Sequence, residues 1–295
     1  PELVGRLIAA RNVGLDDVES FLDPTLKSLM PDPGILQDIT VCIERIAKAV
    51  RDGEHIAVFS DYDVDGATSA AVLMRYLRWL GSDPVLYIPD RISEGYGPNA
   101  PALMKLKEHG ATLIITLDCG VTAYKPLLEA ANAGIDVIVI DHHMAEPELP
   151  KALAIVNPNR IDEDGSLGHL AACGVTFLVS VALNRALRQT GYFNKRQEPN
   201  LLHLLDMVAL GTVCDVVPLK GLNRAFVIQG LKVMAQRGNK GLVALADVAG
   251  VDARPESYHL GYVLGPRVNA GGRVGKSDLG ARLLLTDSPE EARAL

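Results

Sequence analysis

The chain has 295 residues, a hydrophobic content of 48% and a formal net charge of −7. This composition supplies enough apolar surface for a large buried core and excludes an intrinsically disordered protein. The apolar runs, such as 111–117 and 135–140, are shorter than the roughly 20 residues that a membrane helix needs, so we expect a soluble protein without membrane contact. The four cysteines are far apart in the sequence, which argues against a disulfide framework or thiolate zinc site and fits a reducing cytoplasm.

The negative net charge is unusual for a protein that acts on nucleic acid, because a basic surface is the usual mark of phosphate binding. The charge is unevenly distributed, however. The stretch 220–282 contains ten Lys or Arg residues against four Asp or Glu residues. This stretch predicts either a phosphate-facing surface or an ordinary solvated helix surface, and charge alone does not separate the two.

Residues 1–40 contain a short helical pattern followed by the Pro- and Asp-rich passage 31-PDPG-34. Such a passage interrupts regular structure, so we predict a lead-in segment before the main domain. No function can be assigned to it from its residues.

From residue 41 onward, helical and strand patterns alternate. Gly53 and Gly81 stand where helix C-caps belong. Apolar strands that alternate with helices predict an α/β fold with a doubly wound, mostly parallel sheet and helices on both faces, which we assign to residues 41–165. The predicted helices are 41–53, 67–81, 99–109 and 123–133, and the predicted strands are 55–60, 84–89, 111–117 and 135–140.

Beyond residue 165 the strand-like runs become rare. Long helical patterns cover 168–190, 199–212 and 222–236, and they predict a largely helical continuation over 166–285. The last residues, 286–295, read as the start of a linker helix, within which we expect the chain to be truncated.

Acidic or imidazole side chains follow three of the predicted strands. The first strand runs into 61-DYDVDG-66, the third into 117-LDCG-120 and the fourth into 141-DHH-143. In doubly wound sheets the carboxyl ends of the strands share one edge, where reactive groups gather. We therefore expect these side chains to converge on one site.

Asp61, Asp63 and Asp65 occupy alternate positions, so an extended backbone would point all three carboxylates to one side. Three like charges so close together are tolerable when a divalent cation neutralises them. Carboxylates with one or two imidazoles suit Mn²⁺ or Mg²⁺. We expect Gly66 to let the backbone approach a bound group where a helix begins, since a helix N-terminus favours phosphate.

Each of these motifs has a simpler interpretation. The D-x-D-x-D-G pattern resembles a calcium loop, but position 72, where such a loop needs an acidic residue, is Val72. A lone Asp118 is more often a turn or cap residue, and only its context favours a site. Asp215 lies in an apolar stretch, where metal ligation would remove the cost of burying its charge. Cys119 has no evident base beside it, which argues against a thiol nucleophile.

Six segments in this order resemble the DHH phosphoesterase superfamily and, within it, its single-strand-specific exonucleases. The resemblance extends over nearly the whole chain. The segments are 58-VFSDYDVDGATSAAVL-73, 116-TLDCG-120, 138-IVIDHH-143, 156-VNPNR-160, 206-DMVALGTVCDVVPL-219 and 264-LGPRVNAGGR-273.

The resemblance implies two bound cations, Mn²⁺ or Mg²⁺. Asp118 would bridge the two, Asp63 would bind one, and Asp65, His142 and Asp215 would bind the other. The residues implied to support catalysis are Asp61, Asp141 and His143, with His143 placed to touch the scissile phosphate.

The resemblance also implies single-stranded DNA as the substrate, hydrolysed from the 5′ end to mononucleotides during DNA repair and recombination. The implied substrate-binding residues are Arg91, Arg267, Asn269 and Arg273, and arginine suits phosphate because its planar fork bonds two oxygens at once. A monomer that works with single-strand-binding protein and a helicase would fit this role. Full-length relatives carry a second domain with a glycine-glycine-histidine motif, and often an OB-fold, and we expect both to be absent here.

The reaction expected from these residues is two-metal hydrolysis of a phosphodiester by water. Hydrolysis of short oligonucleotides, cyclic dinucleotides or pyrophosphate is a second possibility within the superfamily. A replication scaffold that kept the fold and lost the chemistry is a third. In such a scaffold we would expect broken ligand positions, whereas all five are present here.

Overall fold

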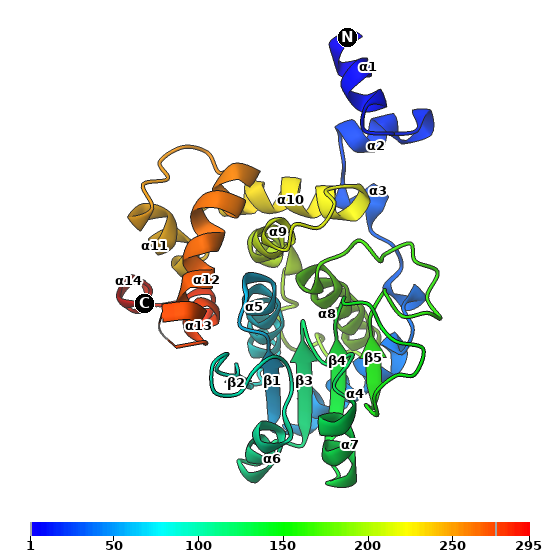
Figure 1. Cartoon of the computed structure of the whole chain (residues 1–295), viewed down its shortest axis with the longest axis vertical. Helices are drawn as coiled ribbons and strands as arrows, with labels where there is room; N and C mark the ends of the chain where they lie inside the picture. Colours follow the sequence, from blue (N-terminus) through cyan, green and yellow to red (C-terminus); the bar gives the residue numbers. More distant parts are fainter. Residues whose placement is uncertain (1, 275) are drawn as a thin grey trace.

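The centre of the molecule is a five-stranded parallel sheet, seen in a computed structural model that describes residues 2–274 and 276–295 (Figure 1). The strand order is β2-β1-β3-β4-β5, and every neighbouring pair is parallel. The predicted α/β class is thus confirmed. The strands are β1 (Ile56–Ser60), β2 (Val85–Tyr87), β3 (Leu113–Leu117), β4 (Asp136–Ile140) and β5 (Ala154–Val156).

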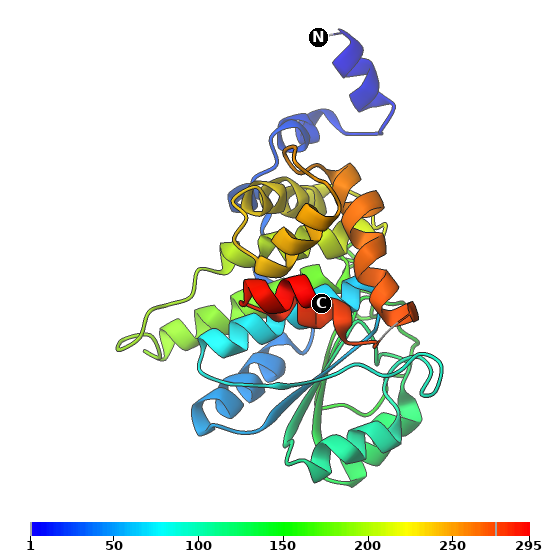
Figure 2. The same ribbon diagram turned by 90° about the vertical axis from the view of Figure 1, so that its left-hand side faces the viewer.

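Helices cover both faces of the sheet, as Figure 2 shows. Successive strand residues face opposite sides. Val58 and Ile115 therefore pack with one group of helices, whereas Phe59 and Ile114 pack with the other. The first group is α4 (Ile39–Asp52), α5 (Val64–Trp79) and α8 (Ala172–Gln189), and the second is α6 (Ala100–Glu108) and α7 (Tyr124–Asn132).

The strand order creates a topological switch point at one edge of the sheet, and we call the region above it the crevice. From β1 the chain passes to β2 on one side and returns to β3 on the other side of β1. The loops that follow two adjacent strands diverge where the strand order reverses. Ligands of doubly wound proteins bind between these loops, outside the carboxyl ends of the two strands. Here the crevice lies above β1 and β3.

The start of α5 corrects the sequence prediction for residues 61–65. The helix begins at Val64, because the Asp63 carboxylate accepts a hydrogen bond from the Gly66 amide at 2.9 Å and caps it. Asp65 therefore lies in the first helical turn, and the prediction of an extended segment was wrong. Gly66 was expected to let the backbone approach a bound group. In the structure it lets the backbone approach the chain itself, since a Cβ there would lie 2.4 Å from the Asp61 carbonyl oxygen.

The C-terminal part is helical, as predicted, and is built around α9 (Leu205–Cys214). Residues 205–212 are all buried, because α9 is apolar on every side and packs between α5, α8 and α10. The domain boundary placed at residue 165 stays a prediction. The remaining elements are η3 (Leu201–Leu204), α10 (Gly221–Met234), α11 (Lys240–Val248), the π-helix η4 (His259–Leu264), α12 (Gly265–Val274), α13 (Leu279–Leu285) and α14 (Pro289–Ala294).

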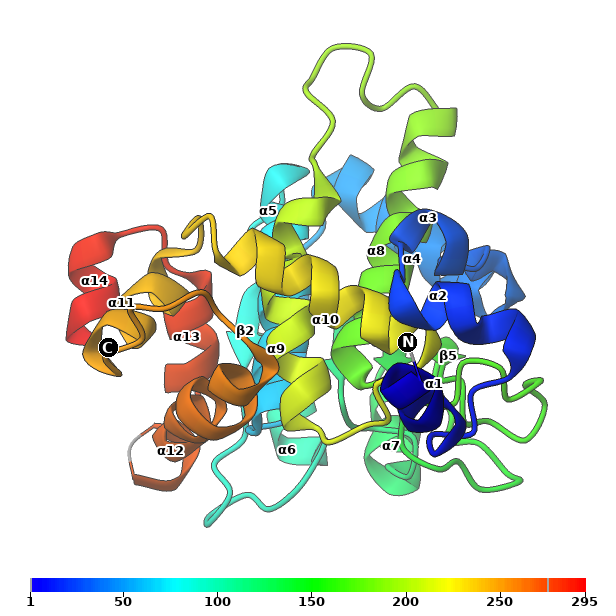
Figure 3. The ribbon, with the colours of Figure 1, turned by 90° about the horizontal axis from the view of Figure 1, so that it is seen from above.

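The lead-in segment contributes little to the core. Its first helix, α1 (Glu2–Ala9), buries no residue and extends away from the body in Figures 1 and 2, so that it lies in front of the body in the view from above in Figure 3. Arg224 of α10 holds the segment by donating a hydrogen bond to the Phe21 carbonyl at 2.7 Å, with its guanidinium 4.2 Å from the Phe21 ring centre. The other elements before α4 are η1 (Leu15–Asp17), α2 (Val18–Leu22), α3 (Leu26–Leu29) and η2 (Pro33–Ile35).

Within the described residues, no helix combines the length and the apolar character that crossing a membrane requires.

Replacing the buried Asp206 with asparagine is expected to stabilise the protein at neutral pH. Burial at the start of α9 raises the pKa of Asp206 to about 6. In the unfolded chain Asp206 has its ordinary, lower pKa. Ionisation of Asp206 therefore lowers the free energy of unfolding as pH rises from about 4 to 6. Asp206→Asn removes this cost while an amide oxygen still accepts from the Met207 amide.

The expected gain in the free energy of unfolding is up to about 3 kcal/mol at pH 7 and close to zero at pH 4. Urea unfolding of both proteins at the two pH values measures it. An Asp206→Asn variant less stable than the parent at pH 7 would contradict the expected cost of the buried charge.

Candidate metal centre

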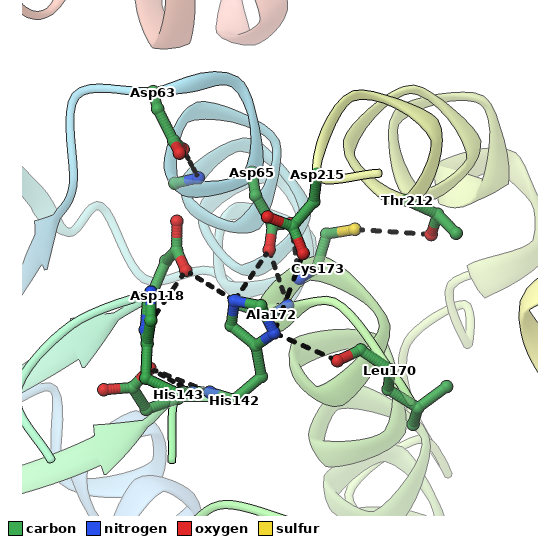
Figure 4. A network of polar contacts seen from close by, with 12 residues as sticks. Asp63, Asp65, Asp118, His142, His143, Leu170, Ala172, Cys173, Thr212 and Asp215 are labelled. Carbon is green, nitrogen blue, oxygen red and sulfur yellow. Dashed lines mark hydrogen bonds and ion pairs between the residues drawn. The ribbon is translucent and has the colours of Figure 1, made fainter. Parts of the chain in front are cut away.

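Eight acidic and imidazole side chains meet in the crevice above β1 and β3. They come from the ends of β1, β3 and β4, from the first turn of α5 and from the C-cap of α9, and Figure 4 shows most of them in close view. Three groups have ligand atoms within 4.8 Å of one another. These groups are Asp118, His142 and His143; Asp65, His142 and Asp215; and Asp61, Asp63 and Asp118.

The His142 ring is oriented so that Nε2 faces Asp118 and Asp65, whereas Nδ1 lies 3.7 Å from Asp215 Oδ2. Its Nδ1 lies 3.1 Å from the Leu170 carbonyl oxygen, which can only accept a hydrogen bond. Nδ1 therefore donates in this contact, which leaves Nε2 as the atom that can ligate a cation. This Nε2 atom is buried without a hydrogen-bond partner among the described residues, 3.3 Å from Asp118 Oδ1 and 3.8 Å from Asp65 Oδ2. Metal-binding histidines are commonly held in this way, with the other ring nitrogen hydrogen-bonded.

Asp65 is held by the first turn of α8. The backbone amides of Ala172 and Cys173 donate to its two carboxylate oxygens at 2.6 and 2.9 Å. The free amides of a helix N-terminus stabilise negative charge, which partly offsets the burial of this carboxylate. The space around it is tight, since a Cβ on Gly211 would lie 3.0 Å from Asp65 Oδ1 and 2.2 Å from Thr68 Oγ1.

The carboxylates strongly disfavour one another's ionisation in the absence of a cation. Burial, together with the charges of Asp65 and Asp63, raises the pKa of Asp118 well above its usual range. Burial and neighbouring carboxylates also raise the pKa of Asp61 and of Asp215 to about 7. Buried oxygens on Asp61 and Asp118 have no hydrogen-bond partner among the described residues. Divalent cations fit this set of donors, because they supply positive charge and ligate the unpaired oxygens.

The backbone at Asp118 has a strained conformation, at the turn that leads from β3 into the crevice. Its φ of 58° lies in the left-handed region, which non-glycine residues seldom adopt. Gly120, with a φ of 115°, completes the turn, and a Cβ there would lie 2.8 Å from Thr116 Oγ1. Such strain occurs often at functional sites, where it aims a side chain.

Asp141 and His143 form a separate pair at the outer side of the cluster. Asp141 Oδ1 lies 2.7 Å from His143 Nδ1, and Asp141 Oδ2 accepts from the Val121 amide at 3.0 Å. Burial would raise the pKa of Asp141, but these hydrogen bonds lower it overall, and the bond with Asp141 raises the pKa of His143. Since the His143 side chain is 47% exposed, its second nitrogen can donate a proton or hydrogen bond to a ligand in the crevice.

Three further polar residues support the site and were not identified as such from the sequence. The side-chain amides of Asn157 and Asn159 donate to the backbone carbonyls of His143 and His142. Tyr96 donates to the Asp118 carbonyl at 3.3 Å, with its ring edge-on to His143. The motif 156-VNPNR-160 and the loop after β2 were the available signals, but neither indicates which backbone atoms these side chains reach.

Two of the predicted phosphate-binding arginines lie beside the segment that follows β1. The Arg91 guanidinium lies 5.2 Å from the centre of the Tyr62 ring. Arg273 is at the end of α12, where a Cβ on Gly272 would lie 3.2 Å from the Tyr62 carbonyl oxygen. Both arginines therefore lie near Asp61 and Asp63, although their roles stay predictions.

Asn269 and Arg267 occupy different sides of α12. Asn269 is four residues from Arg273 and so lies on the same side of the helix. Arg267 donates to the Val263 carbonyl at 2.7 Å and lines a cavity of about 300 Å³ together with residues of α11 and α14, such as Leu245 and Ala292. The position of Arg267 therefore supports a role in substrate binding less well than the position of Arg273 does. The substrate-binding roles of Arg267 and Asn269 stay predictions.

Comparison with known proteins points to one family. The model described as "DHH family, N-terminal domain" matches residues 55–212. The single-stranded-DNA-specific exonuclease RecJ of Salmonella typhimurium is 40% identical over 100% of this chain and 51% of its own length. RecJ of Bacillus subtilis is 36% identical over 99% of this chain and 36% of its own length. The chain thus spans about half the length of RecJ proteins, or less.

Solved structures agree with this relationship. A structure of exonuclease RecJ bound to manganese superposes with a TM-score of 0.78 and 35% identity, over 88% of this chain and 63% of that one. RecJ from Thermus thermophilus in complex with Mn²⁺ gives a TM-score of 0.76 and 33% identity, over 94% and 38% of the two chains. With a family model matched over more than half of its residues and a sheet and crevice of the expected kind, the chain belongs to the DHH family.

Proposed function

We propose that this chain is the catalytic part of a metal-dependent exonuclease that hydrolyses single-stranded DNA in the 5′-to-3′ direction. The observation that carries the proposal is the buried cluster of carboxylates and His142, in which every predicted ligand position is intact and several ligand atoms lack partners among the described residues. A scaffold without chemistry would have no need to retain such an unfavourable arrangement. The similarity to proteins named single-stranded-DNA-specific exonucleases supports the choice of substrate.

Two cations, Mn²⁺ or Mg²⁺, would share Asp118, which appears in two of the three ligand groups. Asp63 would hold one cation, whereas Asp65, His142 and Asp215 would hold the other. Cations bound in this way would lower the pKa of the attacking water and offset negative charge on the phosphoryl oxygens.

The protein side chains would orient the substrate around this centre. Arg91 and Arg273 would hold phosphates on the side of Tyr62, since a guanidinium bonds two phosphate oxygens at once. His143, kept protonated more readily by Asp141, would donate a hydrogen bond to the scissile phosphate. The same activity would place the protein in DNA repair and recombination, as a monomer alongside single-strand-binding protein and a helicase.

The test is product sizing from labelled DNA with and without Mn²⁺. We expect a 5′-labelled single strand to release its label first as a mononucleotide, a 3′-labelled strand to shorten progressively, and a blunt duplex to remain intact. Cleavage of dinucleotides alone would favour the short-oligonucleotide activity. Absence of cleavage despite calorimetric binding of Mn²⁺ would contradict the exonuclease.

A further inference from the structure

Two tyrosines form an exposed stacked pair away from the metal centre. Tyr258 and Tyr262 are 61% and 75% exposed, and their ring centroids are 5.4 Å apart with an interplanar angle of 26°. Large aromatic side chains are more often at least partly buried, so two neighbouring rings presented to solvent suggest a binding role. Their outward faces are of the size and chemistry on which nucleic-acid bases stack.

The helix that carries the pair is firmly anchored. Leu260 and Leu264 of η4 are buried, and Cys214 donates from its thiol to the Leu260 carbonyl at 3.5 Å. A Cβ on Gly261 would lie 3.2 Å from Val213 Cγ1, so η4 packs closely on the end of α9 next to Asp215. The π-helical turn is itself unusual, and such turns occur frequently at functional sites. The tyrosines are therefore fixed in place relative to the metal centre.

A continuous helical path joins the pair to the predicted phosphate-binding residues. α12 follows η4 without a break and ends beside Tyr62. Asn269 and Arg273 are four residues apart, which places them on one side of α12, and Tyr262 lies seven residues before Asn269 in the preceding π-helical η4. At 1.5 Å per residue the helix covers roughly 16 Å from Tyr262 to Arg273. This length corresponds to about five nucleotides at a stacked spacing of 3.4 Å, and to fewer in an extended strand.

The charge along this path suits a polyanion. Residues 254–273 contain three arginines against one acidic residue, Glu256, and one of these arginines, Arg273, lies on the side of α12 that carries Asn269. Aromatic faces combined with basic groups are the usual means by which proteins bind single strands without sequence preference. A protein partner would gain less from this arrangement, because Arg273 would need an acidic group opposite it.

We propose that Tyr258 and Tyr262 form a base-stacking platform that binds the single strand a few nucleotides from the cleavage site, with the intervening phosphates along α12. This inference rests on the proposed function, because it names a second contact for the same substrate. It assigns the platform a role in binding and in length preference, and none in the chemical step.

The test compares the double variant Tyr258→Ala/Tyr262→Ala with the parent chain. Binding of a labelled 12-nucleotide oligothymidylate is measured by fluorescence anisotropy in Ca²⁺, and cleavage of a 12-mer and of a dinucleotide is measured in Mn²⁺. We expect the Kd for the 12-mer to rise at least roughly fivefold, with dinucleotide hydrolysis unchanged. The conservative Tyr258→Phe/Tyr262→Phe variant should bind like the parent, because a phenyl ring still stacks.

Two controls make the result specific. Trp79, which is 40% exposed at the far end of α5 from Asp65, offers a matched aromatic, and Trp79→Ala should leave the Kd unchanged. Arg273→Ala should reduce the salt dependence of binding by about 0.7 in the logarithmic slope, whereas the tyrosine variant should preserve the slope.

The outcomes separate the platform from the proposed function. An unchanged Kd in the double alanine variant, or an equal loss of dinucleotide and 12-mer cleavage, overturns the platform. A parent chain that binds the 12-mer without cutting it contradicts the exonuclease, and weaker binding by the variant in that case still supports the platform.

Discussion

Replacing Asp118 with alanine is expected to reduce Mn²⁺-dependent cleavage of a single strand by at least roughly a thousandfold. Asp118 belongs to two of the groups, as His142 does, and its Oδ1 lies 3.3 Å from His142 Nε2, so its loss would disturb both proposed cation positions. Its backbone also lies in the left-handed region, at the turn that presents the carboxylate to the cluster. The rate of mononucleotide release at saturating Mn²⁺ measures the effect.

Asp83 offers the matched control for this substitution. It follows α5 near the opposite edge of the sheet, and its side chain is 89% exposed beside Arg78. Such surface ion pairs contribute little, so Asp83→Ala should retain full activity and stability. Substantial cleavage by a correctly folded Asp118→Ala protein would refute the assignment of the metal centre.

Divalent cations are expected to stabilise the fold as well as to support catalysis. Burial and mutual repulsion raise the pKa values of Asp61, Asp118 and Asp215, so the cation-free cluster opposes folding at neutral pH. At a hundred times its Kd, a bound cation adds about 2.7 kcal/mol, which corresponds to a rise in Tm of about 4 °C for a protein of this size. Thermal unfolding in Mn²⁺ and in chelator measures the difference.

The Asp118→Asn variant tests whether the cluster is the cause of this stabilisation, because its Tm should change in opposite directions without and with cations relative to the parent. Without cations it should be more stable than the parent, because one buried negative charge is gone, and Mn²⁺ should raise its Tm much less. A parent chain with the same Tm in Mn²⁺ and in chelator would indicate that the cluster does not bind the ion.

The sequence was sufficient to predict the arrangement of strands that builds the site. Apolar runs that end in Asp61, Asp118 and Asp141 imply parallel strands whose carboxyl ends meet, and the structure brings these residues together. Local patterns carry this information because strand period and helix period differ. The three-residue strand β5 gave no comparable pattern and was not predicted.

The contacts that orient the ligands could not be predicted in the same way. Asp65 is held by Ala172, more than a hundred positions away, and His142 by the carbonyl of Leu170. Backbone amides and carbonyls are the same at every residue, so no residue type marks them as partners. The extended reading of residues 61–65 failed for a related reason, since the cap formed by Asp63 competes with the strand pattern.

The C-cap position of Asp215 has a consequence for biosynthesis. This residue follows the last position matched by the family model, and the packing of α9 against α5 and α8 places it at the cluster. A nascent chain that has emerged only as far as β5 has the sheet and four of the five predicted cation ligands, yet it lacks the fifth. The cation cluster of a nascent chain would therefore be complete only after the helical part has emerged and packed against the sheet.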